Sequence, residues 1–479
     1  MRYWFVLALS IIIGMPFAKA QQNVKVSDIL ASEDAFIQWV IANHPIALEA
    51  NLLATEAKAQ ILEAKGGFDP KLYADWDQKS FDEKNYFSIG DAGVKLPSWY
   101  GLAFKAGYLL SNGVFLNPAN KLPTVGQGVA EIKWTLLQGL LMDERRANLA
   151  KADIQLIMND AARISNLNKL LMSALDNYWD WMMITEKRQI QEQALSNARL
   201  RLEGTVQSFI EGDKPRIDTI EAFIQVQNRV ADLNKIQTYE GNARILLSNF
   251  LWLNGQQMIE IDNQVETLDL DEQEEVIPMQ ELTNLKALLD ALHPDIRQIQ
   301  AKLQQLDVDK KLAREQFKPQ LDVSYAFLSG GEDFFYNSND ENPALWDLFS
   351  QNYKWNVTFN FPLFLRKARG KMEQIKVKTL RNNFKLVEKR RTIQNKINTL
   401  MSELTLAKTQ IDLYTEMVNN YQQLFEAEQF KFQLGESSVF LINSREQKLL
   451  DAQLKLIDLK GNFHKKKAKL LYAAGLLAD

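Results

Sequence analysis

The chain is organised around a helical stretch that begins at residue 139 with GLLMDERRANLAKADIQLIM and keeps its helical pattern as far as Gly212. A second stretch of this kind runs from Pro362 to Gly435, and both intervals are 73 residues (212 − 139 and 435 − 362). At a rise of ~1.5 Å per residue, such a helix measures on the order of 110 Å. Ordinary domains use helices of ~11 to 12 residues, so the pattern indicates a coiled coil or a helical repeat.

The second stretch carries an apolar seam with a period of about 3.5 residues, which is typical of helices that supercoil around neighbours. Its members alternate in spacing between four and three residues: Ile393, Ile397, Leu400, Leu404, Ala407, Ile411, Tyr414, Val418, Tyr421 and Phe425. The first stretch has a looser stripe: Ile164, Leu167, Leu171, Ala174, Tyr178 and Met182. These seams alone fit a soluble coiled coil equally well.

The N-terminal residues predict export. Arg2 precedes an apolar run from Trp4 to Phe17, and Ala18-Lys19-Ala20 forms an A-x-A cleavage site, so we expect residues 1–20 to be a signal peptide. The 479 residues include no cysteine and carry a formal net charge of −4, which argues against a disulfide framework and against nucleic-acid binding. No later stretch is apolar enough for a transmembrane helix, so membrane insertion would require a closed β-barrel.

Two further motifs at equal spacing indicate a tandem repeat. His44-Pro45 is followed after 24 residues (68 − 44) by the F-x-P-x-L motif Phe68 to Leu72, and His293-Pro294 is followed after 24 residues (317 − 293) by Phe317 to Leu321. Proline suits the first turn of a helix, so each His-Pro is expected to begin one. We predict a first repeat over 21–255, a linker over 256–285 and a second repeat over 286–479.

Each repeat is predicted to contain a strand hairpin, over 68–139 and over 317–362. In the second hairpin, apolar Leu321, Val323, Tyr325, Phe327, Tyr353, Trp355, Val357, Phe359 and Phe361 alternate with polar Asp322, Ser324, Lys354, Asn356, Thr358 and Asn360. One aromatic face and one polar face fit the wall of a membrane barrel, although the edge of a soluble sandwich also alternates. The first window is longer and has room for an extra strand pair, and the strand number is expected to be even.

Shorter helices are expected to run back from Gly212 to Asn254 and from Gly435 to Gly475. Each is too short to match the outbound helix alone. Together with the helix that precedes each hairpin, however, it nearly makes up the missing length. We therefore expect two stacked short helices beside each long one, with the acidic linker near the break.

Over essentially its whole mature length, the sequence resembles the TolC-like outer-membrane efflux protein family, the outer membrane factors. The likeness rests on the paired His-Pro and F-x-P-x-L motifs, on Pro362-Leu363-Phe364, and on the F-x-x-G turns Phe209 to Gly212 and Phe432 to Gly435. The resemblance implies an α+β membrane protein, a homotrimeric TolC-like α/β-barrel. In it, an outer-membrane β-barrel in contact with lipid continues into a long periplasmic tunnel of coiled-coil helices.

The resemblance also implies a function. The protein would be the passive outer-membrane channel of a tripartite efflux or type I secretion system, located in the cell outer membrane and extending into the periplasm. A periplasmic adaptor and an inner-membrane pump would be its partners, and the adaptor would dock at tips formed by Phe209, Gly212, Phe432 and Gly435.

We expect no enzyme activity, no cofactor and no metal site, because three histidines without cysteine give no catalytic or metal-binding constellation. We interpret His44 and His293 as residues of helix starts. Lys465, Lys466 and Lys467, near His464, are interpreted as a solvated face or as charges that favour a helix C-terminus.

Two features depart from the family pattern. Gly139-Leu140-Leu141 replaces Pro-Leu-Phe in the first repeat, and the longer first hairpin puts the usual four strands per subunit in question. Relatives commonly place gate carboxylates six and nine residues beyond the second tip glycine, where this chain has Leu441 and Ser444. The first repeat has Asp218 and Glu221 at these offsets, one near-turn apart.

Asp218 and Glu221 are therefore our gate candidates. Threefold symmetry would gather them into a ring of six carboxylates that attracts cations. The alternative is that both are ordinary solvated residues, or that they pair with Arg216 or Arg445.

The competing interpretation of the whole chain is a periplasmic coiled-coil adaptor. Adaptors usually carry one coiled-coil hairpin inside a lipoyl-like β-domain, whereas this chain has two helical hairpins and two aromatic strand windows. A periplasmic enzyme on a helical scaffold has no supporting residues. Fractionation with the outer membrane and heat-modifiable migration in detergent would separate the channel from both alternatives.

Overall fold

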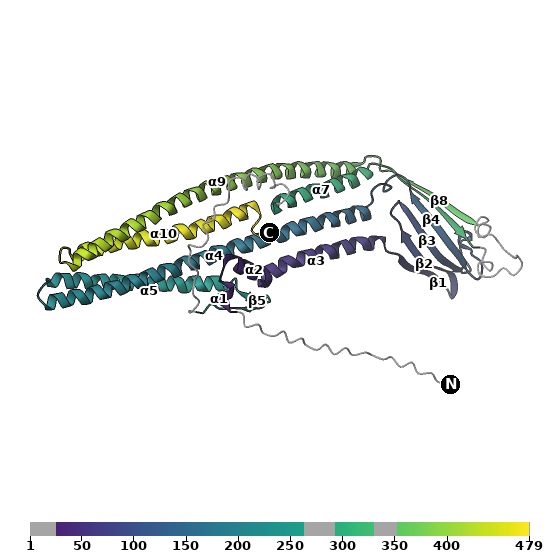
Figure 1. Cartoon of the computed structure of the whole chain (residues 1–479). Coiled ribbons are helices and arrows are strands. Elements are labelled where there is room, and N and C mark those ends of the chain that lie inside the picture. Colours follow the sequence, from purple (N-terminus) through teal and green to yellow (C-terminus); the bar gives the residue numbers. More distant parts are fainter. Residues whose placement is uncertain (1–24, 263–292, 330–351, 479) are drawn as a thin grey trace, which may run out of the picture.

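The computed structural model describes residues 25–262, 293–329 and 352–478. The predicted signal peptide, the acidic segment 330–349 and most of the predicted linker lie outside the described residues. The described part is elongated, with helices over most of its length and a β-sheet at one end (Figure 1). Within these ranges, no helix combines the length and the apolarity needed to cross a membrane.

Two long helices, α4 (Glu144–Ile210) and α9 (Arg366–Gln433), confirm the two predicted stretches. Helix α4 starts at Glu144 because the Asp143 side chain accepts a hydrogen bond from the Arg146 backbone amide at 2.9 Å and so caps the first turn. Most of the predicted seam of α9 is buried, from Ile393 to Ile411 and again at Phe425. Both helices begin four or five residues later than the apolar boundary at Gly139 and Pro362 suggests.

Two shorter helices lie beside each long one (Figure 1). Helices α3 (Pro45–Lys65) and α5 (Arg216–Ser248) pack against α4, and α7 (Pro294–Glu315) and α10 (Val439–Ala474) pack against α9. Helices α4 and α7, and α4 and α10, also contact each other. The predicted stacking of short helices beside long ones is therefore confirmed.

The sequence pattern from Val26 to Ala42 is helical, and the structure forms two helices there rather than one. The pattern is divided into α1 (Val26–Ile29) and α2 (Glu33–Asn43), because the Ser32 hydroxyl accepts a hydrogen bond from the Ala35 amide at 3.0 Å and caps a new helix. The first residues of the predicted linker also form structure, since β5 (Trp252–Leu253) pairs with β6 (Gln257–Met258). Short 3₁₀ turns η1 (Gly66–Phe68) and η2 (Pro118–Asn120) complete the described elements.

The main sheet has six antiparallel strands in the order β1-β2-β3-β4-β7-β8. The strands are β1 (Lys71–Phe81), β2 (Lys84–Pro97), β3 (Leu102–Asn112), β4 (Gln127–Thr135), β7 (Gln320–Leu328) and β8 (Tyr353–Asn360). The first hairpin window thus holds the predicted extra strand pair. Its tight β1–β2 turn places Asp82 and Glu83 at φ of 53° and 56°.

One face of this sheet is apolar and the other is polar. Directly paired residues share a face, and the pairs Val323↔Val357 and Tyr325↔Trp355 alternate with Asp322↔Thr358 and Ser324↔Asn356. The apolar face is open: Trp355 and Phe359 are each 65% exposed. Strands β1 and β8 each have a neighbour on one side alone, so two sheet edges remain unpaired within the described chain.

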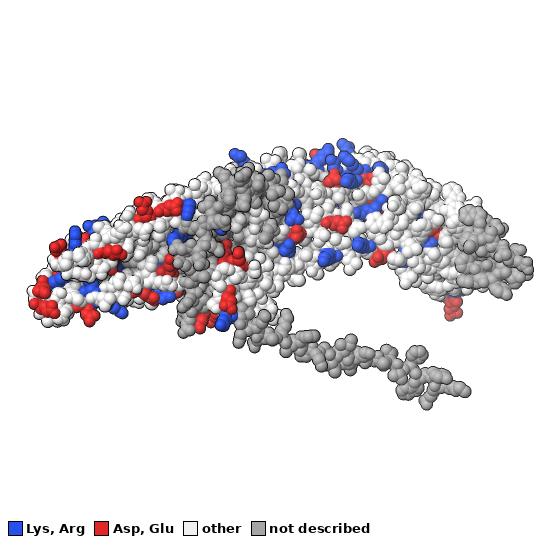
Figure 2. All heavy atoms as spheres, in the orientation of Figure 1, with Lys and Arg blue, Asp and Glu red and all other residues white. Residues whose placement is uncertain are grey.

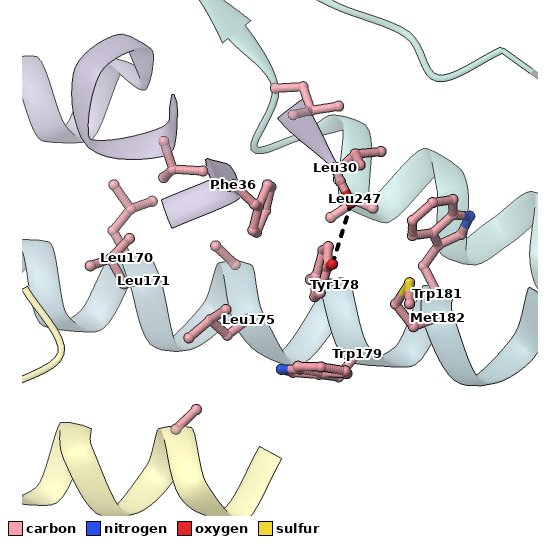
Figure 3. Packing of buried hydrophobic residues seen from close by; sticks show 14 of the residues in the cluster. Leu30, Phe36, Leu170, Leu171, Leu175, Tyr178, Trp179, Trp181, Met182 and Leu247 are labelled. Atoms are coloured by element: carbon pink, nitrogen blue, oxygen red, sulfur yellow. Dashed lines mark hydrogen bonds between the residues drawn. The ribbon is translucent and has the colours of Figure 1, made fainter. Parts of the chain in front are cut away.

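The core around the middle of α4 fastens the N-terminal helices to the bundle (Figure 3). The Phe36 ring of α2 stacks on the Tyr178 ring with centroids 5.1 Å apart, and the Tyr178 hydroxyl donates to the Leu30 carbonyl at 3.4 Å. On another side of α4, Trp179 stacks on His464 of α10 at 4.0 Å, and burial lowers the pKa of His464 to about 4. This layer joins α1 and α2 to helices from both repeats.

Candidate functional site at the helical tips

The two helical hairpins end in the same turn. At the first tip, the Gly212 amide donates to the Phe209 carbonyl, and the Asp213 amide donates to the Ser208 carbonyl. At the second tip, the Gly435 amide donates to the Phe432 carbonyl, and the Glu436 amide donates to the Lys431 carbonyl. This is the Schellman arrangement, which needs a left-handed residue after the helix. Gly212 and Gly435 meet the need with φ of 86° and 78°.

A contact between a cation and an aromatic ring joins the two tips. The Lys214 ammonium lies 3.4 Å from the centroid of the Phe432 ring, and burial lowers the pKa of Lys214. A cavity of about 830 Å³ opens between the two hairpins, with Arg201, Gly204 and Ser208 of α4 and Gln429 and Phe432 of α9 among its lining residues. Phe209, in contrast, is 41% exposed on the outside of its turn.

Further from the tips, a buried ion pair joins the hairpins. Arg201 of α4 holds both carboxylate oxygens of Glu446 on α10 at 2.8 and 2.9 Å, and it donates to the Asn443 amide oxygen at 2.6 Å. Sequence reasoning missed this pair. The sequence does contain a signal for it, because both residues are 11 positions from a tip glycine: Arg201 precedes Gly212 (212 − 201), and Glu446 follows Gly435 (446 − 435). Equal distances from the two tips place both residues at the same height in the hairpins.

A second arginine lies near this pair. Arg229 of α5 is 1% exposed, its Nε and Nη2 atoms have no hydrogen-bond partner, and burial lowers its pKa while Glu446 acts in the opposite direction. The Asp232 carboxylate is 4.0 Å from its Nη1 atom. Glu446, Asp232 and Asp451 therefore all offset the charge of the buried Arg229 guanidinium group.

The gate candidates lie on the first turns of α5, directly beyond this tip. Asp218 and Glu221 are both partly exposed on the first two turns of the helix. Within the described ranges neither forms an ion pair, so the alternative pairing with Arg216 or Arg445 is not present in one copy of the chain. Arg445 instead lies 3.6 Å from Glu428.

The interpretation of His44 and His293 as helix starts is confirmed. Each caps its helix, because its Nδ1 atom accepts a hydrogen bond from the amide of the second following residue at 3.2 Å. In the described part of the chain, no three His, Cys, Asp or Glu side chains gather in a way that could hold a metal ion.

The fold matches solved outer-membrane channels. The open state of the Neisseria gonorrhoeae MtrE outer membrane channel aligns with a TM-score of 0.66 at 14% identity, covering 95% of each chain. VceC from Vibrio cholerae aligns at 0.63 and 14% identity (93% of this chain, 96% of that one), and the Campylobacter jejuni CmeC channel at 0.61 and 12% (93% and 86%). No curated protein matches the sequence.

The sequence itself matches one family model, described as outer membrane efflux protein, over residues 287–476. This match and the shared fold confirm the predicted resemblance to the outer membrane efflux proteins. These findings support an outer-membrane channel of an efflux system, with a helical tunnel in the periplasm. They favour the channel over the periplasmic adaptor as the interpretation of the whole chain.

Proposed function

We propose that three copies of this outer membrane efflux protein close into one ring and form a passive conduit through the periplasm and the outer membrane. The observation that carries the proposal is a pair of complementary, unpartnered helix faces. Helices α3, α4, α7 and α9 lie in a row, so α3 and α9 form the two flanks of one copy (Figure 1). A ring would bring α9 of one copy against α3 of the next.

Both flanking helices expose an apolar stripe at coiled-coil spacing. On α9, Val377, Leu380, Phe384 and Val387 are spaced three, four and three residues apart, and Phe384 is 71% exposed. On α3, Leu48, Leu52 and Leu62 are exposed, Leu62 by 71%. Burial of such side chains is worth ~1.5 to 3 kcal/mol each, so these stripes favour a partner helix.

Charges beside the stripes fix the partner and its register. Glu49, Glu56 and Glu63 on α3 recur every seven residues, and so do Lys371, Lys378 and Lys385 on α9. In the first half of α9, residues 366–396 contain twelve Lys or Arg and two Glu, and basic side chains gather over this region in Figure 2. None of the six residues named above forms an ion pair within the described part of one copy.

An antiparallel docking pairs these charges in order. When Glu63 faces Lys371, Glu56 faces Lys378 and Glu49 faces Lys385. The same alignment puts Leu52 between Leu380 and Phe384, and the sheet-proximal ends of α3 and α9 lie side by side. The apolar positions and the charged positions therefore favour the same register. This agreement is expected for a coiled-coil seam in which the flanking charges select the partner.

The sheet supports the same closure. Strands β1 and β8 follow α3 and precede α9, so each sheet edge lies beside the corresponding flanking helix. They run in opposite directions, because strand direction alternates along the six-stranded sheet. An exposed edge is a ready template for another strand, and pairing β8 with β1 of the next copy would satisfy it. The apolar face would then meet lipid and the polar face would line the conduit.

We further propose that a periplasmic adaptor, and through it an inner-membrane pump, docks at the tips. Support comes from the two identical glycine turns, which end the molecule opposite the sheet, and from the cavity between them. We expect this conduit to act passively, without catalysis and without a cofactor.

Engineered cysteines test the ring directly, because the chain has none of its own. With Glu56→Cys and Lys378→Cys combined, a short bismaleimide should link copies in outer-membrane fractions into covalent dimers and trimers. The matched control combines Glu56→Cys with Lys396→Cys, which lies ~27 Å further along α9 and should give no ladder. Equal linking in both variants, or none in either, contradicts the proposed seam.

A further inference from the structure

The polar face of the sheet contains a row of lysines that runs across neighbouring strands. Lys71 pairs with Lys95, Lys95 with Lys105, and Lys105 with Glu131 in the strand registers. On β8, Lys354 occupies the same row, opposite Ala326. Like charges directly opposite each other destabilise a sheet, so three adjacent lysines need a counter-charge.

The chain itself supplies that counter-charge for part of the row. The Lys105 ammonium lies 2.8 Å from the Asp91 carboxylate, which also accepts a hydrogen bond from the Tyr73 hydroxyl at 2.8 Å. Lys71 and Lys95, in contrast, form no ion pair with any described residue. Glu131 is paired with neither of them.

The Tyr73 ring keeps two of these ammonium groups together. It lies 4.1 Å from the Lys95 ammonium and 5.0 Å from that of Lys105. The Tyr73 side chain lies over two glycines of the neighbouring strands, which have no side chain. A Cβ added at Gly93 would lie 2.9 Å from the Tyr73 hydroxyl oxygen, and one added at Gly107 would lie 2.7 Å from it. The two glycines therefore make room for a tyrosine that positions the lysines.

A cavity of about 290 Å³ lies beside this row. Its charged lining residues are Lys71, Lys95, Lys105, Lys133, Arg145 and Glu131. Lys133 is paired with Asp322 at 3.1 Å and Arg145 with Asp143 at 2.9 Å. After these pairings, two ammonium groups (Lys71 and Lys95) and one carboxylate (Glu131) remain without an ion pair in the lining, so the free charge of the cavity is positive.

We propose that Lys71 and Lys95 form a binding site for the carboxylate or phosphate group of an anionic solute on the polar face of the sheet. This site rests on the proposed function, because the polar face lines a passage only if the copies close into a ring. Each ring would contain three such sites at one level, at the end of the sheet that adjoins the helices. Anions would be concentrated there before they traverse the sheet.

Two measurements on the full-length protein test the site. In planar bilayers under a potassium chloride gradient, Lys71→Gln with Lys95→Gln should lower the permeability ratio of chloride to potassium by about threefold or more, since a unit charge ~6 Å away in water changes the local anion concentration by about that factor. In detergent solution, calorimetric titration with inorganic phosphate should give binding to the parent and none to the double variant. Lys84→Gln with Lys121→Gln is the control of equal charge: Lys84 begins β2, Lys121 lies in the connection between β3 and β4, and neither forms an ion pair with a described residue.

The outcomes separate the two proposals. An unchanged permeability ratio, absence of phosphate binding by the parent, or equal losses in the control would overturn the anion site while leaving the conduit intact. Absence of conductance together with absence of cross-linked trimers would instead reject the conduit. Phosphate titration would still decide on the site in that case, because it needs no channel.

Discussion

Glu446 pairs with the buried Arg201 and also offsets the charge of the buried Arg229, so its removal should be costlier than the removal of Arg201. Glu446→Gln leaves Arg201 and Arg229 buried without a full counter-charge, for which we expect a loss of about 3 to 5 kcal/mol in the free energy of unfolding. Arg201→Gln should cost less, since the nearby Arg229 guanidinium group still attracts the Glu446 carboxylate. Urea unfolding of the detergent-solubilised protein, followed by circular dichroism, measures both.

Arg188→Gln is the control for this comparison, because its pairs with Glu192 and Glu240 are partly exposed and should contribute less than about 1 kcal/mol. If Arg201→Gln and Glu446→Gln were equally destabilising, the arrangement of one carboxylate between two cations would be refuted.

At the scale of elements, the two faces of β8 should respond differently to charge. Val357→Arg puts a cation on the apolar face near the middle of the strand, where exposure to lipid costs ~2 to 4 kcal/mol. Asn356→Arg puts the same cation on the polar face, opposite Ser324. Heat-modifiable migration of membrane fractions should show impaired assembly for the first variant alone, and similar behaviour of both would argue against a lipid-facing apolar face.

The helical turns allow a second test. Gly212→Val and Gly435→Val force a branched residue to positive φ, at a cost of ~1 to 2 kcal/mol, although nothing lies within 4 Å of the added Cβ. We expect assembled protein in the membrane but loss of export. Gly241→Val is the matched control, because Gly241 lies inside α5, away from the tip cavity, and an added Cβ would meet only the Arg244 Nη2 atom at 3.9 Å. Normal export by both tip variants would mean that the adaptor docks elsewhere.

The sequence predicted the helices and strands better than it predicted the side-chain contacts between them. Heptad seams and equal intervals located both long helices, because helix length and apolar period are local properties. The break at Ser32 was missed because apolar residues continue across it, and the β1–β2 turn because Asp82 and Glu83 adopt positive φ without a glycine. The Arg201–Glu446 pair joins residues 245 positions apart (446 − 201), so it depends on how two hairpins align, which no local pattern encodes.

At the scale of the whole molecule, the gate carboxylates depend on symmetry. In one copy neither Asp218 nor Glu221 forms an ion pair with a described residue, although the Lys214 ammonium is near enough to interact with Asp218. Both carboxylates therefore remain able to attract cations from solution. Asp218→Asn with Glu221→Gln should therefore weaken block of single-channel current by divalent cations, because six negative charges are lost from the ring. Unchanged block would exclude these residues as the gate. Glu203→Gln with Glu211→Gln is a control on the same hairpin.

The two extra strands also determine how much of the circumference of the proposed ring each copy spans. Six strands spaced ~4.8 Å apart and tilted by ~40°, as in closed sheets, span roughly 38 Å of circumference per copy. The row of α3, α4, α7 and α9, with axes ~9 to 10 Å apart, spans about the same. Four strands would span roughly 25 Å. In the proposed ring the passage would therefore keep its width where helices give way to strands, and a bulky solute that fits the tunnel would meet no step at the membrane.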